Sequence, residues 1–251
     1  MPDWWIVAAL TATGVLTGFI DAVAGGGGLI MMPALLSAGL PPHVALGTNK
    51  LQSTMGTTVA ANTFWRHGQV QVRANLGTAL AVFVAAAAGA LAVQALEVGV
   101  LQLLVPALLL LNALYVVLSP RMDDKDAHER LSARGYTPVA SGIGFYDGFF
   151  GPGTGSFFTA SLVGLRGFGL TRATATTKLF NATSNWASVI VFALGGKVVW
   201  LLGLSIGLGA MVGGFLGSHS AMRLGARLIR PLLATISILL TARLLWDWFA
   251  S

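Results

Sequence analysis

The chain has 251 residues, of which 55% are hydrophobic and 10% are charged, and its formal net charge is +6. A soluble domain usually carries about 25% charged residues, so this composition excludes a surface that faces water everywhere. The basic residues lie in short segments between apolar runs, which is typical of membrane topology and argues against nucleic-acid binding. The absence of cysteine excludes disulfides, thiolate metal sites and cysteine nucleophiles.

The first element is an apolar arm over 4–24, followed by a glycine run and a short apolar arm over 28–38. No basic residue precedes the first arm, so it lacks the start of a signal peptide. The short arm has about 11 residues and reaches about 16 Å at 1.5 Å per residue, roughly half of a ~30 Å hydrocarbon core. We therefore predict a re-entrant helical hairpin.

Three membrane spans are predicted next, at about 45–65, 74–95 and 99–118, followed by a polar cytoplasmic linker over 119–138. The same order then recurs. Gly18-Phe19-Ile20-Asp21 matches Gly144-Phe145-Tyr146-Asp147, and Thr48-Asn49-Lys50-Leu51 matches Thr176-Thr177-Lys178-Leu179. The sequence thus predicts two repeats, 1–118 and 139–251, within one membrane domain.

Charge distribution indicates the orientation of the repeats. If each hairpin returns to its starting side, each repeat crosses three times and the two are inverted. The loops at 66–73, 119–138, 166–172 and 222–230 then share one side and hold 11 of the 15 basic residues: Arg66, Arg73, Arg121, Lys125, Arg130, Arg134, Arg166, Arg172, Arg223, Arg227 and Arg230. Because cytoplasmic loops are rich in Lys and Arg, we predict inverted repeats with both termini outside the cytoplasm.

The interrupted arms predict a polar centre. Inverted repeats with broken helices typically bind substrate near the membrane midplane, and exposed backbone N–H groups at a helix start suit an anion. The glycine turns contribute the first group of candidate binding residues: Gly25, Gly26, Gly27, Gly151, Gly153 and Thr154. The alternative is a tight helix–helix turn that binds nothing.

Two equivalent lysines, Lys50 and Lys178, lie about five residues inside predicted spans. Polar neighbours accompany them on the same helices, and the second group of candidate binding residues is Thr48, Asn49, Lys50, Gln52, Thr177, Lys178 and Asn181. In the alternative interpretation, each lysine extends to the lipid headgroups instead of facing the centre.

Asp21 and Asp147 occupy matching positions just before the two glycine turns. A carboxylate inside the membrane is costly, by about 2.5–3.5 kcal/mol on insertion scales, so it needs a partner or a role. We consider three roles: capping the hairpin, pairing with a lysine, or carrying a coupled proton.

At these motifs the chain resembles the sulfite exporter TauE/SafE family, particularly its YfcA-like members. The resemblance is carried by Gly18-Phe19-Ile20-Asp21 with the glycine run, by the segment from Ala45 to Gln52, and by the segment from Gly144 to Gly155. It implies a multi-pass carrier of the prokaryotic inner membrane that exports sulfite, a sulfonate or a related organic anion.

Together these observations predict an all-α integral membrane fold of two inverted repeats, each a re-entrant hairpin plus three transmembrane helices. The predicted function is secondary transport, in the direction of export, of a small anion such as sulfite, a sulfonate or another organosulfur or organic anion. An anion channel and an uptake carrier for an unrelated organic anion remain alternatives. We expect no enzyme activity, cofactor, metal site or nucleic-acid partner; the partners are the anion and the lipid bilayer, and a homodimer stays open.

Overall fold

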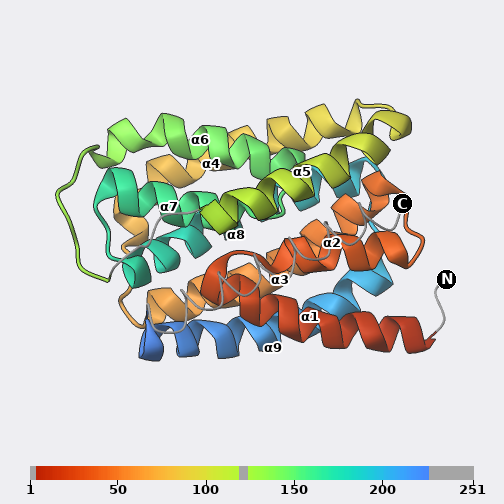
Figure 1. Cartoon of the computed structure of the whole chain (residues 1–251), viewed down its shortest axis with the longest axis horizontal. Helices are drawn as coiled ribbons and strands as arrows, with labels where there is room; N and C mark the ends of the chain where they lie inside the picture. The colour runs from red at the N-terminus through yellow and green to blue at the C-terminus, as the bar shows by residue number, and fades with distance from the viewer. Residues whose placement is uncertain (1–3, 119–123, 226–251) are drawn as a thin grey trace.

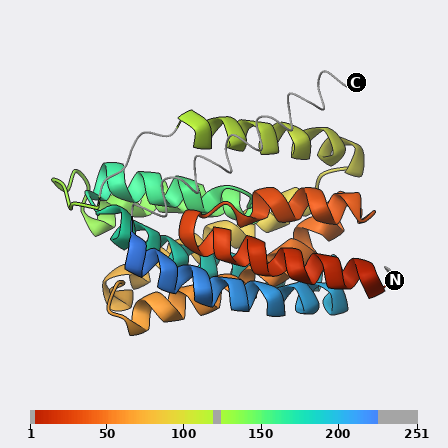
Figure 2. The same cartoon turned by 60° about the horizontal axis from the view of Figure 1, so that its bottom comes forward.

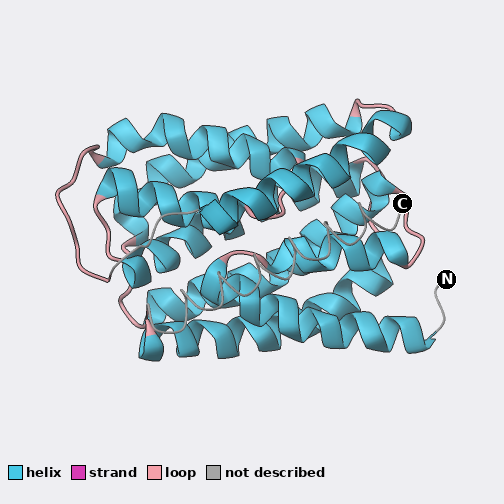
Figure 3. Ribbon diagram, in the orientation of Figure 1, coloured by secondary structure: helices cyan, strands magenta, loops and turns pink. Residues whose placement is uncertain are grey.

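The computed structural model describes residues 4–118 and 124–225, and every regular element in these ranges is an α-helix (Figure 3). The all-α prediction is therefore confirmed for the described part of the chain. Its helices are α1 (Trp4–Ala24), α2 (Gly27–Ser37), α3 (Pro42–Arg66), α4 (Val72–Gln94), α5 (Val98–Leu118), α6 (Ala133–Phe149), α7 (Thr154–Arg166), α8 (Leu170–Leu194) and α9 (Trp200–Leu224). The last predicted span of the second repeat lies outside the described residues.

Both predicted interruptions of the chain are present, and glycine explains them. α1 ends just before Gly25, whose φ is 77°, and α6 ends just before Gly151 and Gly153, whose φ values are 97° and 82°. These values lie in the left-handed region, which side chains with a Cβ disfavour. The chain therefore leaves the helix and returns as a second, shorter helix in each case.

Helix length and polarity separate three groups of helices. α1, α4 and α9 have 21, 23 and 25 residues and are apolar enough to cross a membrane. α2 and α7 have only 11 and 13 residues, about 16–20 Å at 1.5 Å per residue, too short for a ~30 Å core. α3 and α8 have 25 residues each and carry most of the buried polar side chains.

The helices pack in a reciprocal pattern between the two halves of the sequence. α1 lies along α9, α6 lies along α4, and α3 contacts α8 between them (Figure 1). Backbones approach closely at small residues: a Cβ at Gly18 would meet the backbone of Ala210, and one at Gly144 would meet that of Val82. Since Gly18 matches Gly144 in the repeated motif, both halves contain a close backbone approach at the same glycine.

The two hairpins enter the bundle from different ends. In Figure 1, α1 begins at the end where the N-terminus lies, whereas α6 begins at the opposite end, next to the segment that precedes it. The α1–α2 and α6–α7 turns both lie inside the bundle and not at its ends. Figure 2 shows α5 along the outside of the described helices.

One boundary differs from the sequence prediction. The polar segment was predicted over 119–138, but α6 begins at Ala133, so its last residues are helical. Ser132 explains the early start, because its side chain accepts a hydrogen bond from Gly135 N at 3.2 Å and caps the helix. The polar composition of residues 119–138 predicted a loop, and that prediction took no account of the helix cap at Ser132.

Candidate functional site

The tips of the two hairpins touch each other. A Cβ at Gly25 would lie 2.5 Å from the Cα of Gly155, so only glycine permits this approach. Ser156 adds a hydrogen bond across the junction, donating to the carbonyl of Ala24 at 3.2 Å. Because these residues come from opposite halves of the sequence, the junction brings the two predicted glycine sites into one place.

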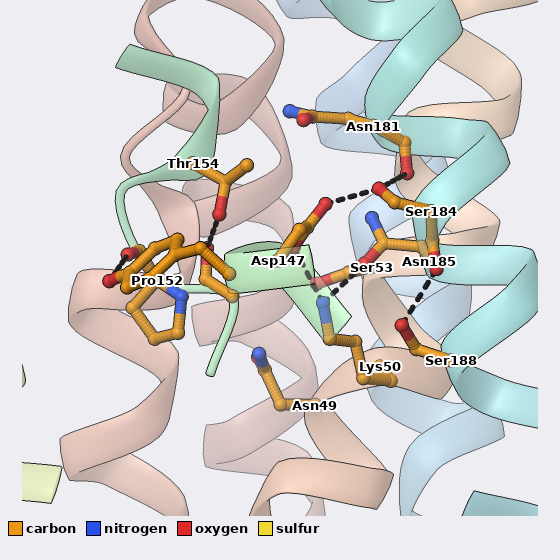
Figure 4. Close-up of polar contacts among 12 residues, drawn as sticks. Asn49, Lys50, Ser53, Asp147, Pro152, Thr154, Asn181, Ser184, Asn185 and Ser188 are labelled. Atoms are coloured by element: carbon orange, nitrogen blue, oxygen red, sulfur yellow. Dashed lines mark hydrogen bonds and ion pairs between the residues drawn. The ribbon is translucent and has the colours of Figure 1, made fainter. Parts of the chain in front are cut away.

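Lys50 of α3 reaches the hairpin of the other half (Figure 4). Its ammonium group lies 2.6 Å from one carboxylate oxygen of Asp147 and donates to the side-chain oxygen of Asn185 at 3.1 Å. The second carboxylate oxygen of Asp147 accepts from the hydroxyl of Ser184. A Cβ at Gly151 would lie only 2.8 Å from the lysine nitrogen, so the glycine turn leaves the room that Lys50 occupies.

Lys178 of α8 makes the equivalent contact in the other direction. It lies 3.0 Å from a carboxylate oxygen of Asp21 and also donates to the backbone carbonyl of that residue. The lysine side chain is fully buried, whereas the Asp21 side chain is 23% exposed. The side chain of Asp147 is only 4% exposed. Both ion pairs therefore join a lysine to an aspartate, but the two carboxylates differ in solvent exposure.

These contacts bear on two alternatives from the sequence. Lys50 and Lys178 are 1% and 0% exposed, so neither extends toward lipid headgroups. The helix starts of α2 and α7 have no side-chain cap, and the two carboxylates pair with lysines instead of capping the hairpins. Of the three roles considered for Asp21 and Asp147, lysine pairing is the one that matches the observed contacts.

A small polar cavity lies between the ion pairs. Its walls include the Lys50–Asp147 pair, the carboxylate partner of Lys178, glycines of both turns and three asparagines: Asp21, Gly25, Gly28, Asn49, Lys50, Ser53, Thr57, Asp147, Gly151, Gly153, Thr154, Gly155, Asn181 and Asn185. Its volume is about 20 Å³, enough for about one water molecule. The side-chain oxygen of Asn181 is buried and accepts no hydrogen bond from the described residues, so the wall holds an unpaired polar group.

Six predicted binding residues do not line this cavity. Thr48 accepts a hydrogen bond from Val199 N at 3.1 Å, and Thr177 bonds to Thr159 at 3.0 Å, so both connect helices to each other. Gln52 bonds to Asn49 at 2.9 Å and, with Gly27, borders a smaller neighbouring space of about 10 Å³. The remaining two, Gly26 and Lys178, are absent from both walls, and Lys178 reaches the centre only through its contact with Asp21.

The predicted set omitted several residues that the structure brings to the centre: Ser53, Thr57, Ser184 and Asn185. Asn185 follows Asn181 by four residues and Lys178 by seven, the spacing of one helical face. Extending the polar stripe of α8 by one turn would have found it. Ser184 lies beside that stripe and gives no comparable signal.

Long apolar helices around two lysine–aspartate ion pairs and two interrupted helices define a multi-pass membrane protein with a polar centre. The sequence profile of the family described as sulfite exporter TauE/SafE matches residues 10–244, and the chain belongs to that family of membrane transporters. The prediction of a transporter in place of an enzyme is thereby confirmed, as is the family resemblance.

The chain is also similar to curated proteins along almost its entire length. It is 45% identical over 243 residues to a "probable membrane transporter protein ORF9" of Sinorhizobium sp, covering 96% of this chain and 93% of the relative. It is 42% identical over 247 residues to a "probable membrane transporter protein" of Haemophilus influenzae, covering 97% of both chains. For the "probable membrane transporter protein YfcA" of Escherichia coli K12, identity is 40% over 243 residues, covering 96% of this chain and 90% of the relative. No solved structure matches the chain.

Proposed function

We propose that the protein is a secondary carrier that exports a small anion, such as sulfite, a sulfonate or a related organic anion, through the cavity at the hairpin tips. The observation that carries the proposal is the crossed pair of contacts made by two buried lysines, Lys50 with Asp147 and Lys178 with Asp21. Each lysine is a positive charge held inside the membrane by a carboxylate of the other half. Only the family description indicates that the transported anion contains sulfur.

The two halves act as inverted repeats in this proposal. Support comes from the equivalent contacts α1–α9 and α6–α4, and from hairpins that start at opposite ends of the bundle (Figure 1). The basic loops then lie on the cytoplasmic side, with both termini outside the cytoplasm, in a prokaryotic inner membrane. Such a pair of repeats can rock about a fixed central site and expose it to one side at a time.

The central step of the mechanism is an exchange of partners. The cavity holds about one water in this conformation, so an anion enters only when the hairpin tips separate. Separation pulls each lysine away from its carboxylate, and the anion replaces the carboxylate as the acceptor. The buried lysine never stays unpaired, which matters because an unpaired charge at this depth is costly.

The charges of the site also suggest how transport is driven. Two lysines and two aspartates sum to zero, so an anion that binds while both carboxylates are ionised adds net negative charge. Export of one negative charge across an inside-negative potential of 100 mV gains about 2.3 kcal/mol. We assign proton coupling to Asp21, the more accessible carboxylate. When this residue is protonated while the anion binds Lys178, the loaded site is neutral, so the proton then replaces the membrane potential as the coupled charge.

The test is counterflow in proteoliposomes. Vesicles preloaded with unlabelled sulfite, thiosulfate or sulfoacetate receive the labelled anion outside, and the initial uptake is measured. A carrier accelerates labelled uptake when its cargo is inside, whereas a channel does not. We expect acceleration by at least one of these anions in the wild type, and loss of that acceleration in Lys178→Met.

Lys197→Met is the matched control, because Lys197 is an exposed lysine in the α8–α9 loop outside the cavity. It removes the same charge and should leave counterflow unchanged. Equal counterflow in the wild type and in Lys178→Met would overturn the proposed site. Acceleration absent for all three anions would overturn the carrier.

A further inference from the structure

A second, larger cavity lies at one end of the bundle, away from the hairpin tips. It is bounded by the α3–α4 loop, the starts of α4, α6 and α8, and the end of α7 with the turn after it: Gly68, Gln69, Gln71, Ala74, Asn75, Ala133, Arg166, Phe168, Arg172 and Thr176. Its volume is about 200 Å³, against about 20 Å³ for the central cavity. This space is more than ten times the ~10–15 Å³ that a water molecule needs, so it accommodates a small hydrated anion without movement of the helices.

The chemistry of the wall suits a negative ligand. Among the described residues that line it, two are arginines, three carry side-chain amides, and none is acidic. The arginines are held in place by the ring between them: the guanidinium of Arg172 lies 3.9 Å from the centre of the Phe168 ring and that of Arg166 lies 5.1 Å from it. This arrangement fixes two positive charges at one mouth and costs little side-chain entropy when a ligand binds.

The acidic partners of these arginines leave donors free. Glu129 contacts Nη2 of Arg166 at 3.2 Å, and Asp126 contacts Nη1 of Arg172 at 3.0 Å. The Nε–H of Arg166 is buried and has no acceptor among the described residues. A guanidinium has five N–H donors in a planar fork that matches an oxyanion, so Arg166 lacks the acceptor that such a ligand supplies.

Two backbone amides at the start of α8 already have acceptors. Asp126 accepts from Gly169 N at 2.6 Å and Asp124 accepts from Thr171 N at 2.8 Å. The donors that we assign to an anion in this cavity are therefore the arginine and amide side chains.

The cavity is also close to the central ion pairs along α8. Thr176 is part of its wall and precedes Lys178 by two residues. Arg172 and Lys178 are separated by about 9 Å along the helix axis, at 1.5 Å per residue. One helix thus carries a positive charge at the wide cavity and another at Asp21, a residue in the wall of the narrow one.

We propose that the cavity around Arg166 and Arg172 is a second anion site, which binds a small free oxyanion of the sulfite or sulfonate class before it reaches Lys178. Its place in transport rests on the proposed function, whereas binding itself does not. An anion held by both arginines at the mouth raises the local concentration at the centre.

The test begins with equilibrium binding of radiolabelled sulfite to the purified full-length protein in neutral phosphatidylcholine nanodiscs at low ionic strength. Arg166→Gln and Arg172→Gln should each weaken binding at this site at least about tenfold, the loss expected for a charge-assisted hydrogen bond. Arg73→Gln is the matched control, because it removes an exposed arginine from the α4 start that does not line the cavity. Arg166→Lys keeps the charge without the fork and should restore binding only in part.

Counterflow separates the failure of this site from the failure of the carrier. The arginine variants should raise KM by about tenfold and change kcat by less than about twofold. Arginine-independent binding together with normal counterflow would overturn the second site and leave the carrier intact. Arginine-dependent binding without counterflow in the wild type would keep the site and overturn the carrier.

One further result identifies the ligand that binds in this cavity, and a second variant covers the case in which the first does not fold. If binding depends on the arginines only in nanodiscs with anionic phosphatidylglycerol, the ligand is a lipid phosphate and the free-anion proposal is wrong. If Arg166→Gln does not fold, Arg172→Gln decides, because that side chain is 45% exposed and its removal leaves no buried group unpaired.

Discussion

At the scale of single residues, the pairing of lysine with aspartate governs both stability and the proposed transport. Lys50 and Asp147 are almost fully buried together. Removing one partner of a buried pair leaves the other charge without compensation, whereas replacing both with apolar groups of similar size often costs little. Stability and transport therefore respond differently to single and double changes at this pair.

Lys50→Met should lower the melting temperature clearly, since an unpaired Asp147 costs about 3–5 kcal/mol. The double variant Lys50→Met/Asp147→Leu should recover most of that loss, yet both variants should lack counterflow. The measurement is thermal unfolding in detergent together with counterflow. An unchanged melting temperature in the single variant would contradict a stabilising ion pair.

Asp21→Asn and Asp147→Asn should differ because the two carboxylates differ in exposure, 23% against 4%. We expect Asp21→Asn to keep anion exchange at equal pH but to lose the response of net transport to a pH gradient. Asp147→Asn should mainly lower the melting temperature. A pH response retained by Asp21→Asn would remove this residue as the proton carrier.

At the scale of elements, the broken helices depend on a few glycines with positive φ. Gly151 has φ 97° and lies against the Lys50 ammonium group, whereas Gly142 lies inside α6 with nothing within 4 Å of an added Cβ. The same substitution therefore has opposite consequences at two places nine residues apart.

Gly151→Ala should destabilise the protein and abolish counterflow, because the methyl group is strained at this φ and collides with Lys50. Gly142→Ala should be neutral or raise stability by up to about 1 kcal/mol, the usual preference of a helix for alanine. Melting temperatures and counterflow of the two variants provide the comparison. Equal behaviour would show that the turn tolerates a side chain.

The element scale also shows where sequence reasoning was sufficient. Glycine runs after Asp21 and Asp147 predicted both interruptions, and short apolar arms predicted the short α2 and α7, because these features depend on local backbone preference. Ser132, by contrast, starts α6 inside a segment that polarity assigned to a linker.

At the scale of the whole molecule, the proposed inversion of the repeats has a direct topological consequence. The segment that holds Lys125 and the α8–α9 loop that holds Lys197 should lie on opposite sides of the membrane. Both lysines are exposed, and the chain has no cysteine, so single cysteines can be introduced without background.

Lys125→Cys should react with a membrane-impermeant maleimide only after the cytoplasmic side is opened, and Lys197→Cys should react in intact spheroplasts. This expectation follows from the positive-inside rule applied to the basic loops. Labelling is read by gel shift in the two preparations. Labelling of both positions from the same side would exclude the inverted arrangement.

The sequence by itself determined the helical class, the family, the duplicated motifs and the identity of the charged residues at the centre, because composition, periodicity and glycine placement are local properties. It left open whether the lysines face lipid or the centre, and which carboxylate each would meet. Only the tertiary structure decided that Lys50 meets Asp147 and Lys178 meets Asp21, partners 97 and 157 residues apart. It also brought Arg166 and Arg172 to one cavity with the α3–α4 loop. The physical reason is that a repeat specifies the chemistry of each half, whereas the crossing of helices from the two halves determines which charges come within contact distance.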